Sequence, residues 1–182
     1  MVDVALRALG KDKITIEVLE MLEPDWGKVT RLVNKDLRAG RASMKEAELV
    51  LIPKQGKDAS TVKGWRPVSL LSVVSKGVER AVAGWLGTTG LVEGWFGQGQ
   101  AGGIPGRSTT DIVLRMLAEV EKDEDVDSWK AVVLMDVKGA FNAARKDYVY
   151  KVLRDKGVLE NIVKWTVDFM SDREIFPRRG ET

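Results

Sequence analysis

One acidic residue follows a short, wholly apolar stretch, and its position suggests metal or phosphate chemistry. Residues 132–135 read Val-Val-Leu-Met and lead directly into Asp136. Such a run, bounded by charge before and by glycine after, is typical of a buried strand with Asp136 at its end. A carboxylate there is solvated, paired or bound to a cation, because burying it uncompensated is costly. It could mark only the point where the strand emerges into water. The backbone amides of residues 138–140 could approach a phosphate, since two of these residues are small.

The residue types that are missing narrow the chemistry. The 182-residue chain has no cysteine and no histidine, which excludes thiol nucleophiles, disulfides, imidazole catalysis and the usual zinc sites. Catalysis would need carboxylates, amines, hydroxyls or a cation held by oxygen ligands. At 44% hydrophobic residues, the chain is long enough for one core or two small subdomains. Residues 1–10 contain Asp3 and Arg7 and no long apolar core, so we expect no signal peptide, no membrane span and an intracellular protein.

The net charge of +2 hides an uneven distribution. Residues 28–80 hold twelve lysines and arginines but five acidic residues. This excess fits a surface that faces phosphates. A solvated helix face followed by a basic loop would show the same excess, so both interpretations stay open.

Periodicity and turn signals predict the elements that would position these residues. Helices are expected over residues 13–22, 26–39, 69–85, 108–120, 146–156 and 161–170. Strands or extended segments are expected over 47–52, 64–67, 132–136 and from 175. The glycine-rich stretch 84–106 is interpreted as loop and crossover, and the acidic run 119–127 as a solvated helix end. Residues 180–182 closely follow the start of a new element, so we expect a sequence that is cut rather than finished.

Four stretches of the sequence carry a family resemblance as an ordered set. They are LIPKQGKD at 51–58, GWRPVSLLSVVSK at 64–76, QAGGIPGRSTTD at 100–111 and MDVKGAFN at 135–142. Together they resemble the reverse-transcriptase domain of non-LTR (LINE-like) retrotransposons, over about residues 25–180. Arginine–proline pairs and glycine-rich turns are common singly, whereas the ordered set is specific. The resemblance implies an α+β fold, a partial right-handed polymerase. Its parts would be an amino-terminal extension over 1–24, fingers over 25–125 and a partial palm over 126–182.

The resemblance also implies roles for individual residues. Asp136 matches the first catalytic aspartate of the family, which binds Mg²⁺ together with the Val137 carbonyl. Two such ions hold the attacking 3′ oxygen and the triphosphate in line. Lys54 and Arg66 match positions that neutralise the triphosphate, and Lys57 is a further helper. The partners implied are an RNA template, a DNA primer and a deoxynucleoside triphosphate.

Residues after the aspartate and in the glycine-rich stretch are implied to contact substrate as well. Phe141 matches the steric gate that excludes a 2′-hydroxyl, although an ordinary core aromatic fits the same pattern. Gln100 and Arg107 fall in the segment that lies along the template–primer in the family. The implied nucleotide-binding set is Lys54, Arg66, Lys138, Gly139, Ala140 and Phe141.

The sequence departs from the family in one small and one large way. Asn142 stands where the family often has aspartate. More importantly, the chain contains no Asp-Asp pair, whereas the family needs a Tyr/Phe-x-Asp-Asp hairpin. When several residues act as a unit in catalysis, an enzyme that lacks one of them loses nearly all of its activity. The same hairpin would have paired with the predicted strand 132–136, whose edge is then uncovered. We therefore expect a truncated polymerase domain that is inactive and marginally stable by itself.

Two further functions fit the same residues. The chain could be a non-catalytic nucleic-acid-binding module that uses the basic region 28–80. It could also be a helical interaction protein whose partner covers the exposed palm edge. An intact element that works on chromosomal DNA would be nuclear, but the basic residues form no separate nuclear-targeting cluster.

Overall fold

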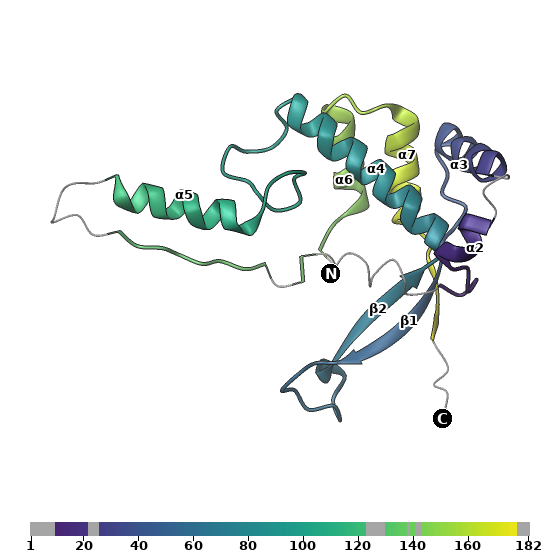
Figure 1. Cartoon of the computed structure of the whole chain (residues 1–182), viewed down its shortest axis with the longest axis horizontal. Coiled ribbons are helices and arrows are strands. Elements are labelled where there is room, and N and C mark those ends of the chain that lie inside the picture. The colour runs from purple at the N-terminus through teal and green to yellow at the C-terminus, as the bar shows by residue number, and fades with distance from the viewer. Residues whose placement is uncertain (1–9, 22–25, 123–129, 138, 141–142, 178–182) are drawn as a thin grey trace. The chain divides into compact units, whose positions relative to one another are not determined.

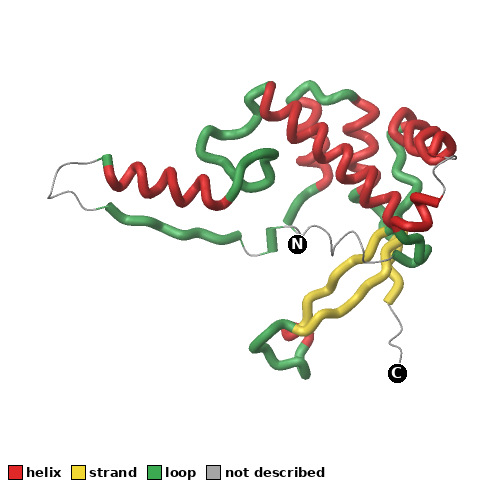
Figure 2. Tube along the Cα trace, viewed as in Figure 1, coloured by secondary structure: helices red, strands yellow, loops and turns green. Residues whose placement is uncertain are grey.

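The computed structural model describes residues 10–21, 26–122, 130–137, 139–140 and 143–177, which contain six α-helices and a three-stranded mixed sheet (Figures 1 and 2). This content agrees with the predicted α+β class. Contacts divide the chain into two compact units, Met1–Arg80 with Arg145–Thr182, and Ala81–Ala144. The predicted ranges 25–125 and 126–182 divide the chain differently and stay predictions.

The first unit contains most of the elements. They are α2 (Ile16–Met21), α3 (Trp26–Ala39), β1 (Glu46–Pro53), the 3₁₀ turn η2 (Val62–Gly64), β2 (Trp65–Leu71), α6 (Lys146–Asp155), α7 (Glu160–Phe169) and β3 (Glu174–Pro177). Helix α4 (Val73–Val92) begins in this unit and ends in the second, which also contains α5 (Thr109–Glu121). In the part of the chain that the structure describes, every helix is too short or too polar to cross a bilayer.

The sheet has the order β2-β1-β3, so β1 is the central strand. β1 pairs antiparallel with β2, with Val50 opposite Val68, and parallel with β3, with Ala47 opposite Ile175. Pro67 lies on the edge strand β2, where the missing N–H of proline is tolerated. The expectation of a helix from Ser69 is wrong, because β2 continues to Leu71 in pairing with β1. The helix begins at Val73 instead.

Helix α7 supplies the centre of the first unit's core. Val163 is 0% exposed and Trp165 is 4% exposed, and Trp165 stacks on Phe169 with ring centroids 5.0 Å apart. The end of α3 approaches α7 so closely that a Cβ on Gly40 would lie 2.7 Å from the Cβ of Lys164. Gly40 also has φ +64°, so glycine is required there for two reasons. The apolar face of α7 is therefore covered by other parts of the same unit.

A carboxylate on α7 connects this helix to the chain that enters β1. Asp168 accepts a hydrogen bond from the Ala42 N–H at 2.7 Å and from the Lys45 ammonium at 2.7 Å. Burial raises the pKa of Asp168, but the hydrogen bonds from Lys45 and Ala42 and the charges of Lys45 and Arg41 outweigh it. The net result is a lowered pKa, so the folded state favours the ionised carboxylate.

Helix α4 is longer than the sequence indicated. The stretch from Gly84 was expected to be loop, yet the helix runs to Val92. A Cβ on Gly87 would lie 3.1 Å from the ring of Pro105, and one on Gly90 would lie 2.7 Å from the ring of Phe96. These glycines therefore let two rings approach the helix closely, and they do not end it.

The start of α5 is as predicted. Ser108 and Asp111 form a capping box, in which the Ser108 N–H and hydroxyl both donate to the Asp111 carboxylate. These two hydrogen bonds, the backbone one first, lower the pKa of Asp111, and nearby Arg107 and Arg115 act in the same direction. The sequence pattern was sufficient here because a capping box is formed by neighbouring residues alone.

Candidate functional site

Asp136, the central residue of the predicted site, lies in an extended segment that is not a strand. Residues 130–137 are drawn as loop in Figure 2, and Asp136 is exposed. The preceding Leu134 and Met135 are 92% and 90% exposed, so the prediction of a buried strand is wrong. A strand needs a partner for its backbone groups, and no described strand pairs with this segment.

The surroundings of Asp136 offer few ligands for a metal ion. Asp136 and the Val137 carbonyl can supply oxygen ligands, which suit Mg²⁺. Across the described ranges, no three carboxylates gather closely enough to hold an ion. One side-chain ligand is fewer than the predicted two-ion site uses, and binding of Mg²⁺ stays a prediction.

The turn after Asp136 is described only in part. Gly139 has φ +69° and its carbonyl accepts the Ala143 N–H at 3.0 Å, while Ala140 is an exposed turn residue. A Cβ built on Gly139 would contact nothing, so its backbone is accessible. Lys138, Phe141 and Asn142 lie outside the described residues. The predicted roles of this group in nucleotide binding stay predictions.

In the first unit, strand pairing brings Lys54 and Arg66 to the same end of the β1–β2 hairpin. Arg66 lies opposite Ile52, and the next pair joins Pro53 to Trp65. The Lys54 N–H then donates to the Gly64 carbonyl at 2.7 Å, directly beyond the last pair. The two cations that the family resemblance singled out are thus neighbours across the hairpin end. Asp136 belongs to the other unit.

The loop of this hairpin is held by its own hydrogen bonds. Asp58 accepts the Ser60 hydroxyl at 2.6 Å and the Ser60 N–H at 2.8 Å, and these bonds lower the pKa of the Asp58 carboxyl. The Trp65 indole N–H donates to the Ala59 carbonyl at 2.8 Å, and the Lys54 ammonium donates to the Lys63 carbonyl at 2.9 Å. The loop therefore has a defined conformation despite its exposure.

The charges at this hairpin end are mostly positive. We call the cations Lys54, Lys57, Lys63 and Arg66 the basic hairpin end. Lys57, Lys63 and Arg66 are exposed, and Lys54 is partly covered. Among residues the structure describes, none of these four forms an ion pair with a carboxylate. Such a cluster can bind phosphate groups without first breaking an ion pair.

Lys63 of the basic hairpin end and the neighbouring Trp65 were not predicted from the sequence as site residues. Lys63 lies in the turn η2, directly before β2. The pairing of β1 with β2 is what identifies both residues. Because Pro53 lies opposite Trp65, the residues next to Pro53 and Trp65 also lie at this end of the hairpin. That register could not be read from composition or motif alone.

In the second unit, Gln100 and Arg107 lie together. The Arg107 guanidinium donates to the Gln100 carbonyl at 2.5 Å, and the Gln100 side-chain amide donates to the Gly102 carbonyl at 3.4 Å. Both side chains are exposed. These contacts explain the conformation of the loop, whereas contact with a template–primer stays a prediction.

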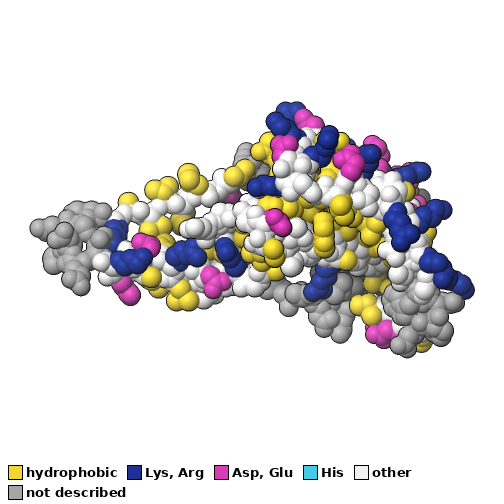
Figure 3. All heavy atoms as spheres, turned by 90° about the horizontal axis from the view of Figure 1, so that it is seen from above, with side chains coloured by type: hydrophobic (Ala, Val, Ile, Leu, Met, Phe, Trp, Pro, Cys, Tyr) yellow, Lys and Arg dark blue, Asp and Glu magenta, His cyan; other side chains and the backbone are white. Residues whose placement is uncertain are grey.

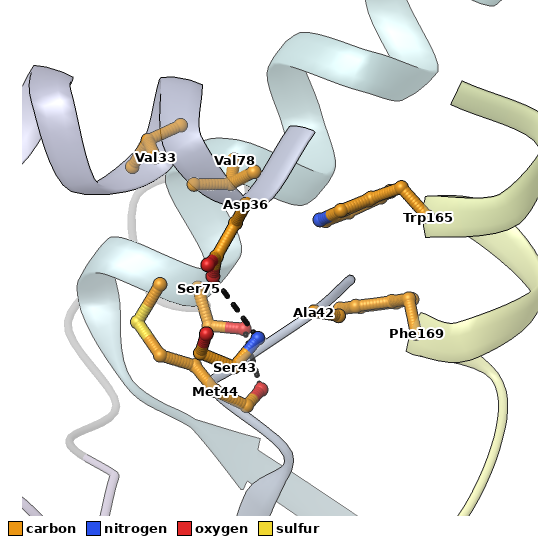
Figure 4. Close-up of a pocket in the computed structure, with 9 residues that line it drawn as sticks. All are labelled: Val33, Asp36, Ala42, Ser43, Met44, Ser75, Val78, Trp165 and Phe169. Carbon is orange, nitrogen blue, oxygen red and sulfur yellow. Dashed lines mark hydrogen bonds between the residues drawn. The ribbon is translucent and has the colours of Figure 1, made fainter. Parts of the chain in front are cut away.

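A small cavity lies inside the first unit, between α3, α4 and α7 (Figure 4). Its volume is about 10 Å³, which is room for roughly one water molecule. Asp36 accepts the Ser43 N–H at 3.1 Å, and the buried Ser75 hydroxyl donates to the Met44 carbonyl at 3.5 Å. These polar groups are satisfied within the protein, so we interpret the cavity as a packing defect and not as a ligand site.

No protein-family model matches the chain, and no curated protein sequence is significantly similar to it.

Proposed function

We propose that the chain is the fingers region and first palm segment of an RNA-directed DNA polymerase of the non-LTR retrotransposon kind. In this proposal, the 182 residues bind nucleic acid and nucleotide phosphates through the basic hairpin end. They do not by themselves complete the catalytic site. Mg²⁺, the RNA template, the DNA primer and the deoxynucleoside triphosphate belong to the intact domain. A partial right-handed polymerase fold is part of the same proposal.

The observation that carries the proposal is the pairing of β1 with β2, which brings Lys54 and Arg66 to the same end of the hairpin. Lys54 and Arg66 come from different motifs of the family resemblance, and the strand register makes them neighbours. An arginine fork and a lysine ammonium at the same end of a hairpin can together neutralise a polyphosphate. Two exposed lysines of the same loop, Lys57 and Lys63, extend the positive surface.

The first experiment measures the binding of the whole chain to a fluorescein-labelled RNA–DNA primer–template by anisotropy at several salt concentrations. The Lys57→Gln/Lys63→Gln double variant should bind more weakly at every salt concentration. Each phosphate contact that is lost should lower the slope of log Kd against log salt by about 1. Both side chains are exposed, so the variant should fold normally, which circular dichroism checks.

The matched control removes the same charge from elsewhere in the first unit. Lys151 lies within α6 and Lys156 directly follows this helix; both are exposed, and Lys151→Gln/Lys156→Gln changes the net charge equally. If binding depends on the basic hairpin end, this control should keep the wild-type slope. Equal losses in the two double variants would show that only overall charge matters, and would contradict the proposal.

The second experiment tests the catalytic part. We expect no extension of a primer by the 182-residue chain with Mg²⁺ and deoxynucleotides, because Asp136 lacks the further carboxylates that two-metal catalysis uses. Steady DNA synthesis that Asp136→Ala abolishes would overturn this expectation and show a complete site.

A non-catalytic nucleic-acid-binding module is the second candidate, and the exposure of the basic hairpin end favours it. The two candidates differ in their response to Asp136 and to nucleotide. RNA binding that ignores Asp136→Ala, Mg²⁺ and deoxynucleotides alike would favour the binding module. Tighter primer–template binding in the presence of Mg²⁺ and the templated nucleotide would favour the polymerase origin.

A further inference from the structure

The extended segment at residues 130–137 is the most exposed apolar part of the second unit. Val133 is 74% exposed, and Leu134 and Met135 are more exposed still. No backbone hydrogen bond joins residues 131–137 to any other described residue. β-Branched and apolar residues with unpaired backbone groups form a template for strand pairing.

The helix before this segment has an exposed apolar stripe. Val113, Met116, Leu117 and Val120 follow one another at helical spacing on α5, and each is well exposed. The carboxyl end of α5 and residues 130–132 line one groove, and the Lys130 ammonium donates to the Glu119 and Val120 carbonyls. Hydrophobic side chains are visible at the surface in the region of α5 (Figure 3, left).

The segment is complementary to itself when it is read in opposite directions. Lys130 and Asp136 carry opposite charges, and each is three positions from Val133. All residues between them are apolar. In an antiparallel pair centred on Val133, each Lys130 would lie opposite the Asp136 of the other copy, and its ammonium would exchange the Glu119 and Val120 carbonyls for that carboxylate. Opposite charges facing each other across strands favour pairing.

We propose that this segment is a dimerisation strand, which pairs antiparallel with the same segment of a second copy of the chain. The two-fold axis runs between the Val133 residues of the two copies. On both sides of this axis, apolar residues of one copy lie opposite apolar residues of the other. Because side chains alternate along a strand, Ala131, Val133, Met135 and Val137 share one entirely apolar face. That face can pack against the apolar stripes of α5, which gives the ribbon the cover that an isolated two-stranded ribbon lacks.

Two-fold symmetry also limits the assembly. An isologous contact uses the same surface on both copies, so this contact joins two copies and is then fully occupied. The proposal therefore predicts a discrete dimer. It does not depend on nucleic-acid binding, which we assign to the first unit.

The test is sedimentation velocity of the nuclease-treated full chain over a range of protein concentrations. The wild-type chain should show a reversible monomer–dimer equilibrium. Asp136→Lys and Lys130→Asp should each raise the dimer dissociation constant by roughly tenfold or more, because like charges then face each other at both ends of the ribbon. The combined Lys130→Asp/Asp136→Lys variant should restore the dimer.

A variant at the centre of the ribbon provides an independent check. Val133→Pro removes a backbone donor and disfavours pairing, while an exposed segment without backbone hydrogen bonds tolerates proline. It should be monomeric with an unchanged circular dichroism spectrum. The proposal is overturned if the wild type stays monomeric at high concentration. It is also overturned if the wild type grows continuously past the dimer, or if the charge-swapped double variant fails to recover association.

Discussion

Helices α7 and α5 are both amphipathic, but only α7 has its apolar face covered. Val163 and Trp165 of α7 are buried, whereas none of the α5 side chains is buried. Helix α7 packs against α3 and α6 within one unit. The described part of the second unit gives α5 no such cover. Periodicity thus predicts which face of a helix is apolar, while the fold decides whether that face contributes to stability.

The largest effect should come from shortening the same side chain on the two helices. Val163→Ala should lower the free energy of unfolding by about 2–3 kcal/mol, because it removes buried methyl groups and leaves a cavity. Val113→Ala, at a position that is 49% exposed, should change it by less than about 0.5 kcal/mol. Urea unfolding followed by circular dichroism at low protein concentration measures both. Equal losses would show that α5 is packed as tightly as α7.

The contact between α7 and the start of β1 predicts a pH-dependent effect of intermediate size. Asp168→Asn should destabilise the first unit by about 1–2 kcal/mol at neutral pH, because the Lys45 ammonium loses its ionised partner. The folded-state pKa of Asp168 is lowered, so its contribution is fully present above the ordinary carboxyl pKa. That contribution is lost as the pH falls through the lower folded-state value. Urea unfolding of both proteins across this acidic range should show their difference shrinking.

A double-mutant cycle with Lys45→Met separates this contact from general acid denaturation. The coupling between the two positions should be favourable at neutral pH and should disappear in acid. A coupling that does not change with pH would contradict the assignment of the stabilisation to the ionised carboxylate.

The smallest effect is local and lies in the second unit. Ser108→Ala removes one half of the capping box and should cost about 1 kcal/mol of stability in the first turn of α5. Amide hydrogen exchange of the residues after Ser108 should become faster by roughly fivefold in consequence. Thr109→Ala, one position later, is the control and should leave exchange nearly unchanged. Identical exchange in all three proteins would mean that the cap does not hold α5.

Local patterns predicted much of the secondary structure correctly. The sequence predicted the bounds of α3, the capped start of α5 and the strand that ends at Pro53. Neighbouring residues determine all three features. The predictions failed where distant residues decide. Ser69–Leu71 continue a strand because β1 lies beside them, and Gly87 lies within a helix at a point where the Pro105 ring approaches closely.

The candidate site was predictable to the same extent. The cations Lys54 and Arg66 could be named from the family resemblance, but their meeting depends on the register of β1 against β2. The stretch before Asp136 has the composition of a buried strand, yet composition cannot supply the partner that a strand requires. The sequence thus indicated which residues could act, and the pairing of strands determined which of them lie together.

The parallel pairing of β1 with β3 has a consequence for synthesis on the ribosome. Ala42 and Asp168, which join the start of β1 to α7, are 126 residues apart in the chain. β2 ends at Leu71 and β3 ends at Pro177, 106 residues later. At a translation rate of roughly 5–20 residues per second, the β1–β2 hairpin is therefore complete roughly 5–21 s before β3 has been made. During that interval the β3-facing edge of β1 is open to any other nascent chain. Chaperone dependence during translation should therefore concentrate on residues 46–53, well before the last helix is complete.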